Sequence, residues 1–264
     1  MDLHLDGKRA IVSGGSKGIG LAIARQLAQE GVDVVIAARG PEVGEVAERL
    51  AAETGRRVLG IQSDTSDDAS VRAMVTQAVA GLGGVDILVN TAAAPWRPEN
   101  NVTTIETSDE LMREQFETKV LGYLRTARAA APHMVAQGWG RIINISGLGA
   151  RSAGSAAQTV RNVAVSAITK NLADELGPQG VNVTVVHPGT TRTAALTERL
   201  AERADAEGTT VAALEQAMTH NSVHRLIDAS EVADVVVFLA SPRSIAITGD
   251  AIAVGGGVPG PIYY

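Results

Sequence analysis

A glycine-rich stretch near the N-terminus has the residue types and the spacing to bind a phosphate group. Residues 13–20 read SGGSKGIG and lie between a short apolar run and a helical pattern. Glycine lets a backbone approach a pyrophosphate closely, and the helix that follows directs free N–H groups at the phosphates. This strand–turn–helix arrangement predicts a dinucleotide site, although a turn needed only for tight packing would look the same. The residues expected to hold the phosphates are Gly14, Ser16, Lys17, Gly18, Ile19 and Gly20.

The residue after the second apolar run selects the dinucleotide. Sites for NAD usually carry Asp or Glu here, which accepts a hydrogen bond from the ribose 2′-hydroxyl. This sequence has Arg39 instead, whose planar guanidinium suits a 2′-phosphate, and Lys17 adds a second positive charge. We therefore expect NADP(H) as the cofactor, with NAD(H) as the weaker alternative. An exposed arginine without a ligand remains the other interpretation of Arg39.

Apolar runs of strand length alternate with longer helical patterns along the chain. Strands are expected at 10–12, 32–38, 57–62, 85–90, 141–146, 181–187 and 249–254, and helices at 21–28, 42–54, 70–81, 110–137, 159–177 and 230–240. The alternation predicts an α/β fold, a Rossmann-like doubly wound parallel sheet of about seven strands with helices on both faces. Because no linker or repeat divides the chain, we expect residues 1–264 to form a single dinucleotide-binding domain.

Two segments depart from this regular alternation. The polar segment 191–225 carries no strand signal and lies where an insertion over the carboxyl edge of the sheet would be. We expect it to be a substrate lid, and a packed pair of helices is the equal alternative. The long helix at 110–137 is expected to bend near Gly122 or Pro132.

The composition excludes several classes of function. The net charge is −6 and aromatic residues make up 3% of the chain, so no nucleic-acid-binding surface is expected. The absence of cysteine excludes disulfides, thiolate nucleophiles and cysteine-bound metals, and no metal site is expected. No apolar stretch approaches the roughly 18 residues of a membrane span, and the N-terminus does not resemble a signal peptide. We expect a cytoplasmic protein that binds neither nucleic acid nor membrane.

Several motifs in a fixed order resemble the short-chain dehydrogenase/reductase family over nearly the whole chain. Gly14, Gly18 and Gly20 match its GxxxGxG motif, and residues 90–93 (NTAA) are similar to its NNAG. Residues 188–193 (PGTTRT) match its PGxxxT loop, which holds the nicotinamide carboxamide. The resemblance also implies a homo-oligomer, either a dimer or a homotetramer. The further cofactor contacts that it implies are Asp64, Thr65, Asn90, Ala92, Pro188, Gly189, Thr191 and Thr193.

The residues that carry the family's chemistry are replaced in this sequence. The family uses Asn, Ser, Tyr and Lys, with Tyr as the general acid/base and with Tyr and Lys spaced as YxxxK. Set against this pattern, Gln158 stands at the Tyr position and Asn162 at the Lys position. Gly147 stands at the Ser position, with Ser146 one residue earlier, and Lys119 stands at the Asn position. The catalytic candidates are therefore Lys119, Asn162, Gln158 and Ser146.

The reciprocal exchange of Lys and Asn points to a substitute proton donor. In the family the two positions face one pocket, so Lys119 would lie near the usual lysine while Asn162 contacts the nicotinamide ribose. Gln158 does not titrate, whereas a buried Lys119 with a lowered pKa can act as an acid. The alternative is that Lys119 is only a tolerated polar residue. Arg161 is expected to face away, because adjacent residues of a helix do not share a face. The weaker candidates for the acid are His187, Tyr263 and Tyr264.

These observations support three hypotheses about function. The first is an NADP(H)-dependent oxidoreductase that acts on a small or medium carbonyl, alcohol, imine or activated alkene with a non-standard proton donor. The intact loop for the nicotinamide favours it. The second is an NADP(H)-binding protein without redox chemistry, such as a regulatory or partner subunit, and the loss of the catalytic residues favours this one. The third is a purely structural subunit that binds no dinucleotide.

Overall fold

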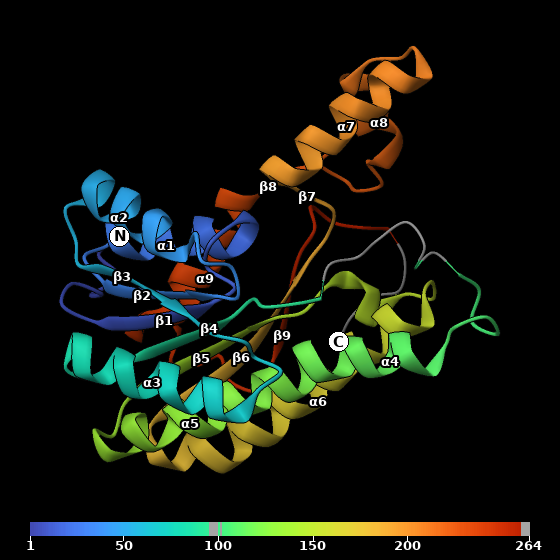
Figure 1. Cartoon of the computed structure of the whole chain (residues 1–264). Helices are drawn as coiled ribbons and strands as arrows, with labels where there is room; N and C mark the ends of the chain where they lie inside the picture. Colours follow the sequence, from blue (N-terminus) through green and yellow to red (C-terminus); the bar gives the residue numbers. More distant parts are fainter. Residues whose placement is uncertain (95–99, 101, 260–264) are drawn as a thin grey trace.

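The computed structural model describes residues 1–94, 100 and 102–259. Its centre is a sheet of seven parallel strands in the order β3-β2-β1-β4-β5-β6-β9 (Figure 1). The doubly wound α/β fold expected from the alternating pattern is confirmed. The strands are β1 (Arg9–Ser13), β2 (Asp33–Ala38), β3 (Val58–Gln62), β4 (Ile87–Asn90), β5 (Gly140–Ile145), β6 (Val181–Pro188) and β9 (Ala251–Val254).

Helices cover both faces of this sheet. Val34 and Ile36 of β2 are buried against one layer of helices, and Val35 between them is buried against the other. Strand side chains alternate between faces, so a strand covered on both faces must be apolar throughout, as β2 is. Among the described helices, none is long and apolar enough to cross a membrane. One face carries α1 (Gly18–Gln29), α2 (Val43–Thr54) and α9 (Ala229–Ala240), and the other carries α3 (Asp68–Leu82), α5 (Gly122–Ala136) and α6 (Ala156–Leu176) (Figure 1).

The strand order reverses at β1, and this reversal positions the functional site. β1 pairs with β2 on one side and with β4 on the other. At such a point the connections leave toward opposite faces, which opens a crevice at the carboxyl ends of the strands. The glycine turn follows β1 at this edge, and Arg39 follows β2.

The helix expected at 110–137 is interrupted by a π-helical segment. α4 (Asp109–Gln115) passes directly into the π-helical residues Phe116–Leu121, and α5 follows. The interruption ends immediately before Gly122, one of the positions where the sequence predicts a bend. π-Helical turns are rare and occur frequently at functional sites. This one carries Lys119.

The segment after β6 forms a pair of helices, α7 (Ala194–Glu207) and α8 (Val211–Met218), which projects beyond the carboxyl edge of the sheet (Figure 1). A two-residue strand, β7 (Thr191–Arg192), pairs in parallel with β8 (Ile227–Asp228) at the base of the pair. The expectation of no strand in 191–225 is therefore wrong at these two positions, and most of the remaining segment is helical. The pair has its own apolar cluster, made of Leu196, Leu200, Ala204, Leu214 and Leu226.

Candidate functional site

Two cavities adjoin at the carboxyl edge of the sheet. The first has a volume of about 580 Å³ and extends from the glycine turn past the end of β2 to Lys119. The second has a volume of about 600 Å³ and lies between the start of α6, the loop after β6 and the end of α8. Four residues line both cavities: Ile19, Ile145, Ser146 and Thr193. A ligand in one cavity would therefore meet a ligand in the other near the end of β5.

The glycine turn has no room for larger side chains. Gly14 has a φ of +74°, and a Cβ there would lie 2.6 Å from Oγ1 of Thr91. A Cβ on Gly20 would lie 2.3 Å from the carbonyl oxygen of Gly14. Lys17 is the N-cap residue of α1, yet its side chain makes no capping hydrogen bond to the first turn. A close backbone cradle at a helix N-terminus of this kind fits the pyrophosphate of a dinucleotide.

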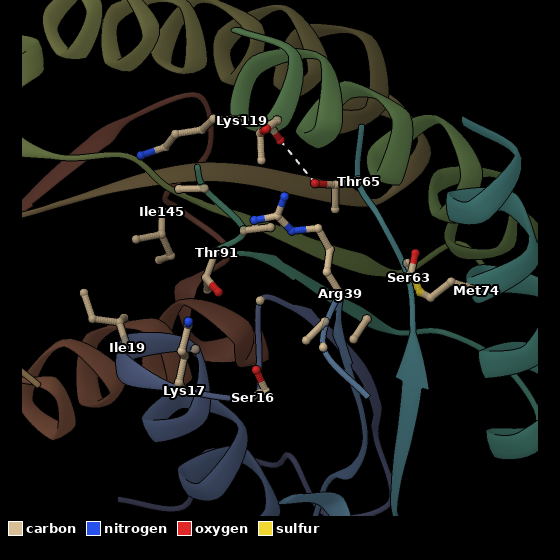
Figure 2. A pocket seen from close by; sticks show the side chains of 18 of the residues that line it. Ser16, Lys17, Ile19, Arg39, Ser63, Thr65, Met74, Thr91, Lys119 and Ile145 are labelled. Atoms are coloured by element: carbon tan, nitrogen blue, oxygen red, sulfur yellow. Dashed lines mark hydrogen bonds between the residues drawn. The ribbon is translucent and has the colours of Figure 1, made fainter. Parts of the chain in front are cut away.

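The part of the first cavity near β2 is cationic. The exposed side chains of Arg39 and Lys17 line it, and Figure 2 shows the Arg39 guanidinium reaching into the cavity. Nε2 of Gln62 donates a hydrogen bond of 2.8 Å to the backbone oxygen of Arg39, which fixes the turn after β2. Glu42 also lines the cavity, and the sequence pattern gave no signal for it. Two cations and one carboxylate leave a net positive charge for a 2′-phosphate.

Three of the expected cofactor residues, Gly18, Asp64 and Asn90, lie outside both linings. Asn90 is fully buried, and its Oδ1 accepts a hydrogen bond of 2.7 Å from the hydroxyl of Thr126. The carboxylate of Asp64 accepts hydrogen bonds from the N–H and the hydroxyl of Ser66. Burial raises the pKa of Asp64, but these two bonds together with the charges of Arg39 and Arg125 hold it below the usual value. Asn90 thus joins the end of β4 to β5 and α5, and Asp64 orders the loop between β3 and α3.

The remaining expected cofactor residues line one cavity or both. Thr193 is the N-cap residue of α7, and its hydroxyl accepts a hydrogen bond of 3.3 Å from the N–H of Leu196. Oγ1 of Thr191 donates one of 3.0 Å to the backbone oxygen of Gly189, within the loop after β6. The first cavity is lined by Gly14, Ser16, Lys17, Gly20, Arg39, Thr65 and Ala92, the second by Pro188, Gly189 and Thr191, and both by Ile19 and Thr193.

Lys119 is a buried lysine close to the place where the cavities meet. Its side chain lines the first cavity and the residue is only 4% exposed (Figure 2). Nζ donates hydrogen bonds of 3.0 Å to the backbone oxygen of Ser146 and of 3.1 Å to Oδ1 of Asn162. Burial, followed by the positive charge of Arg161, lowers the pKa of Lys119 well below its usual value. An ammonium has three hydrogens, so one stays available for a ligand.

The other catalytic candidates gather around this lysine. The hydroxyl of Ser146 donates a hydrogen bond of 3.1 Å to the backbone oxygen of Asn162, which ties the end of β5 to α6. Gln158 is half-buried, one turn earlier on α6, and lines the second cavity with Ser146 and Asn162. A Cβ on Gly147 would lie 3.1 Å from Nδ2 of Asn162. The structure therefore joins Lys119, Ser146 and Asn162 by hydrogen bonds, whereas Gln158 lines only the second cavity.

The expectation that Arg161 faces away from the site is wrong. The residue is only 8% exposed and lines the second cavity beside Gln158 and Asn162. Gln158 and Arg161 are three residues apart, a spacing that places both on one face of α6, and this was the signal available in the sequence. Nη1 of Arg161 donates a hydrogen bond to Oε1 of Gln115. Burial lowers the pKa of Arg161.

His187 is a buried histidine that supports the loop after β5. The residue is 1% exposed, and its Nδ1 accepts a hydrogen bond of 3.3 Å from the N–H of Gly147. Its Nε2 lies 3.3 Å from the hydroxyl of Ser166. Burial, together with the charge of Arg151, lowers the pKa of His187 to about 4. A histidine that is neutral at pH 7 and already bonded through both nitrogens has no proton to offer as an acid.

No tyrosine is among the described residues that line the two cavities. Tyr123 is 1% exposed, and its hydroxyl donates a hydrogen bond of 2.9 Å to the backbone oxygen of Ile145. Burial raises the pKa of Tyr123. The other two tyrosines, Tyr263 and Tyr264, lie outside the described residues.

Sequence reasoning missed part of each lining. Ser63 and Thr91 follow β3 and β4 and line the first cavity. The rule that ligands bind at the carboxyl ends of parallel strands near a topological switch would have included both. Met218, His220 and Asn221 line the second cavity, and no pattern in the sequence marked them.

Comparison with known proteins gives matches over nearly the whole chain. A family model described as enoyl-(acyl carrier protein) reductase matches residues 14–259. The short-chain reductase protein NovJ of Streptomyces niveus is 34% identical over 251 residues, which cover 95% of this chain and 93% of NovJ. The 3-oxoacyl-(acyl-carrier-protein) reductase FabG of Staphylococcus aureus is 32% identical over 267 residues, which cover 95% of this chain and 98% of FabG. The L-sorbose reductase of Gluconobacter frateurii, solved in complex with NADPH and L-sorbose, superposes with a TM-score of 0.93 at 31% identity, covering 99% of this chain and 100% of that chain.

Proposed function

Since the chain belongs to the short-chain dehydrogenase/reductase family, we propose that it is an NADPH-dependent reductase of a small or medium carbonyl substrate. The observation that carries the proposal is the junction of two cavities beside the buried ammonium of Lys119. The first cavity suits the dinucleotide and the second suits the substrate. The similar L-sorbose reductase was solved with NADPH and its sugar together, which supports this division.

The first cavity is proposed to bind NADP(H) rather than NAD(H). The pyrophosphate would lie on the glycine turn, where a Cβ at Gly14 or Gly20 has no space. Arg39 and Lys17 would bind the 2′-phosphate, and Thr65 would contact the adenine. The loop 188–193 would hold the carboxamide of the nicotinamide at the junction of the cavities.

Lys119 is the proposed proton donor. NADPH, when bound, supplies a hydride to the carbonyl carbon, and the carbonyl oxygen then needs a proton. Two hydrogens of the Lys119 ammonium are bonded to Ser146 and Asn162, which leaves the third for that oxygen. Because burial lowers its pKa, this ammonium gives up a proton more readily than an exposed lysine. The products are an alcohol, NADP⁺ and a neutral amine that regains a proton from water.

Three neighbours are proposed to position this lysine and the substrate. Asn162 holds the ammonium through its amide oxygen, and Ser146 holds it through its backbone oxygen. Gln158 lines the second cavity and would orient the substrate by hydrogen bonding, since an amide both donates and accepts. The lack of a tyrosine among the described lining residues supports a lysine as the acid.

Helices α7 and α8 are proposed to act as a lid over the second cavity. Met218, at the end of α8, lines that cavity. Arg192, at the base of the pair, donates two hydrogen bonds of 2.9 Å to Glu215 and one of 2.6 Å to Asp228. These bonds join β7 and β8 to α8, so the helical pair would pivot about Arg192 if it moved.

The chain is proposed to form a homo-oligomer, a dimer or a homotetramer, through α6. Val160 is 43% exposed and Val163 is 47% exposed, and Ala167 is exposed one turn further along. Ala127 and Ala130 of α5 are instead buried in the apolar cluster on the sheet. Light scattering after size-exclusion chromatography should give a mass of two or four chains, and a monomer would contradict the proposal.

A binding titration of the purified protein with NADPH, and in parallel with NADH, tests the proposal first. We expect NADPH to bind at least about tenfold more tightly, the effect of one charge-assisted contact. Consumption of NADPH is then followed by absorbance with a panel of small aldehydes and ketones. Binding without turnover of any of them would favour a nucleotide-binding subunit. Failure to bind either dinucleotide would overturn the proposal.

A further inference from the structure

Lys119 and Arg161 bring two buried basic side chains to one site without a carboxylate partner. They are 4% and 8% exposed. Lys119 donates to the backbone oxygen of Ser146 and to the amide of Asn162, and Arg161 donates to the amide of Gln115. All of these acceptors are neutral. Within the described ranges, neither cation takes part in an ion pair.

The cavity beside Arg161 has no negative charge of its own. Its described lining contains neither Asp nor Glu. In the described lining of the first cavity the only carboxylate is that of Glu42, which lies against Gly40 in the turn after β2. The positive charge of Arg161 is therefore not balanced by the residues around it.

The guanidinium of Arg161 also has unused hydrogen-bonding capacity. Its Nε is buried without a partner, and so is Nε2 of the neighbouring Gln115. The described residues give Nη2 no acceptor. Arginine does not lose its proton in proteins, so it cannot relieve this burial by becoming neutral. A buried charge that stays unpaired is strongly unfavourable, which indicates that an anion completes the site.

We propose that the substrate is an oxo acid, whose carboxylate binds Arg161 in the second cavity while its carbonyl oxygen faces Lys119. This inference rests on the proposed function and narrows its substrate class. A guanidinium fork matches a planar carboxylate with two parallel hydrogen bonds. The amide of Gln158, on the same face of α6, is placed to donate a further bond. The carboxylate is unchanged by the reaction, and the product is a hydroxy acid.

The test compares acids with their uncharged esters. Pyruvate, acetoacetate and 4-oxopentanoate, each beside its methyl ester, are titrated at constant ionic strength into protein saturated with NADP⁺, which prevents turnover. Calorimetry should give acids that bind at least about tenfold more tightly than their esters. Arg161→Met should remove this preference by weakening the acids and leaving the esters unchanged. Arg113→Met, at an exposed arginine of α4 that lines neither cavity, should keep the preference.

A second readout does not depend on choosing the right acid. The positive charge of Arg161 has no carboxylate partner within the described protein. The Arg161→Met variant, without bound acid, should therefore melt at the same temperature as the wild type or at a higher one. A clear fall in the melting temperature of this variant would mean that Arg161 is structural and would overturn the inference. Arg161→Lys, which keeps the charge but loses the fork, should bind acids with intermediate affinity.

The remaining outcomes are equally decisive. Equal affinity for acids and esters, no binding of any acid, or tighter binding of inorganic phosphate than of every acid would each overturn the carboxylate assignment. Binding of NADP⁺ is measured in the same samples. Its failure would count against the proposed function, whereas intact NADP⁺ binding without a preference for acids counts against the oxo-acid inference alone.

Discussion

The ammonium nitrogen of Lys119 lies 3.1 Å from the amide oxygen of Asn162. The two residues are 43 positions apart in the sequence, on the π-helical segment and on α6. They occupy the positions where the family pattern has Asn and Lys, so the exchanged pair is also a contacting pair. Asn162 therefore orients the Lys119 ammonium. The mutations below distinguish the role of Lys119 from the roles of the cofactor-binding residues.

Lys119→Ala should lower the rate of carbonyl reduction by about 10²- to 10⁴-fold, the range for loss of a general acid. Affinity for NADPH should largely survive, because the glycine turn and Arg39 are untouched. Steady-state kinetics and a fluorescence titration measure the two effects. The control is Lys170→Ala, which removes an exposed lysine of α6 paired with Asp174 and should change neither. Unchanged turnover in Lys119→Ala would rule out this lysine as the acid.

Arg39→Ala should weaken NADPH binding by about 10- to 100-fold and leave NADH binding nearly unchanged, because only NADPH carries the 2′-phosphate. Parallel titrations with both dinucleotides measure the difference. Arg49→Ala is the matched control, since Arg49 is an exposed arginine of α2 that lines neither cavity. An equal loss for both dinucleotides would show that Arg39 does not contact the phosphate.

Gly20→Ala should destabilise the fold by about 1–3 kcal/mol and weaken NADPH binding, because the new Cβ would lie 2.3 Å from the Gly14 oxygen. Gly44→Ala provides the contrast, since a Cβ at this position of α2 meets nothing within 4 Å. It should stabilise the protein by about 0.5–1 kcal/mol. Urea unfolding measures both values. A Gly20→Ala protein as stable as the wild type would mean that the turn can shift to accommodate the added Cβ.

The buried His187 should make the protein sensitive to acid. Its pKa is lowered from 6.5 to about 4, so between these values the unfolded chain holds a proton that the native protein does not. Stability is therefore lost as the pH falls from about 6.5 to about 4, by up to about 3 kcal/mol. Urea unfolding across this range should show a flatter profile for His187→Gln. His133→Gln, at an exposed histidine of α5, should keep the wild-type slope, and identical slopes in all three proteins would contradict the assignment.

The sheet and its layers could be predicted from the sequence because strands covered on both faces are apolar throughout, as β2 is. The ends of the helices could not be placed to the residue, because capping hydrogen bonds fix them. The helix expected at 70–81 begins at Asp68, because the Asp67 side chain accepts a hydrogen bond from the N–H of Ala69. The π-helical segment had no local signal. Its extra residue depends on packing against other elements.

The sequence predicted the lining residues of the site where a motif directly follows a strand, and failed where a residue's position depends on packing. The glycine turn and Arg39 were found because both follow strands at the switch point. Asn90 was expected to contact the cofactor, yet its amide is buried and accepts a hydrogen bond from Thr126. The spacing of residues along the sequence does not tell a lining residue from one buried beneath it. Arg161 was misplaced because it was compared only with its adjacent residues, although its three-residue spacing from Gln158 places both on one face of α6. Its hydrogen bond to Gln115 on α4 had no signal in the sequence.

The small apolar cluster between α7 and α8 is distinct from the two clusters that pack on the sheet. Substitutions that reshape the second cavity from this side leave the glycine turn and the layers around β1 untouched. If the pair is the proposed lid, exchanging this one compact insertion would change the substrate on a constant scaffold. A chimaera that carries the corresponding helices of a relative should fold and still bind its dinucleotide, with only the choice of substrate transferred.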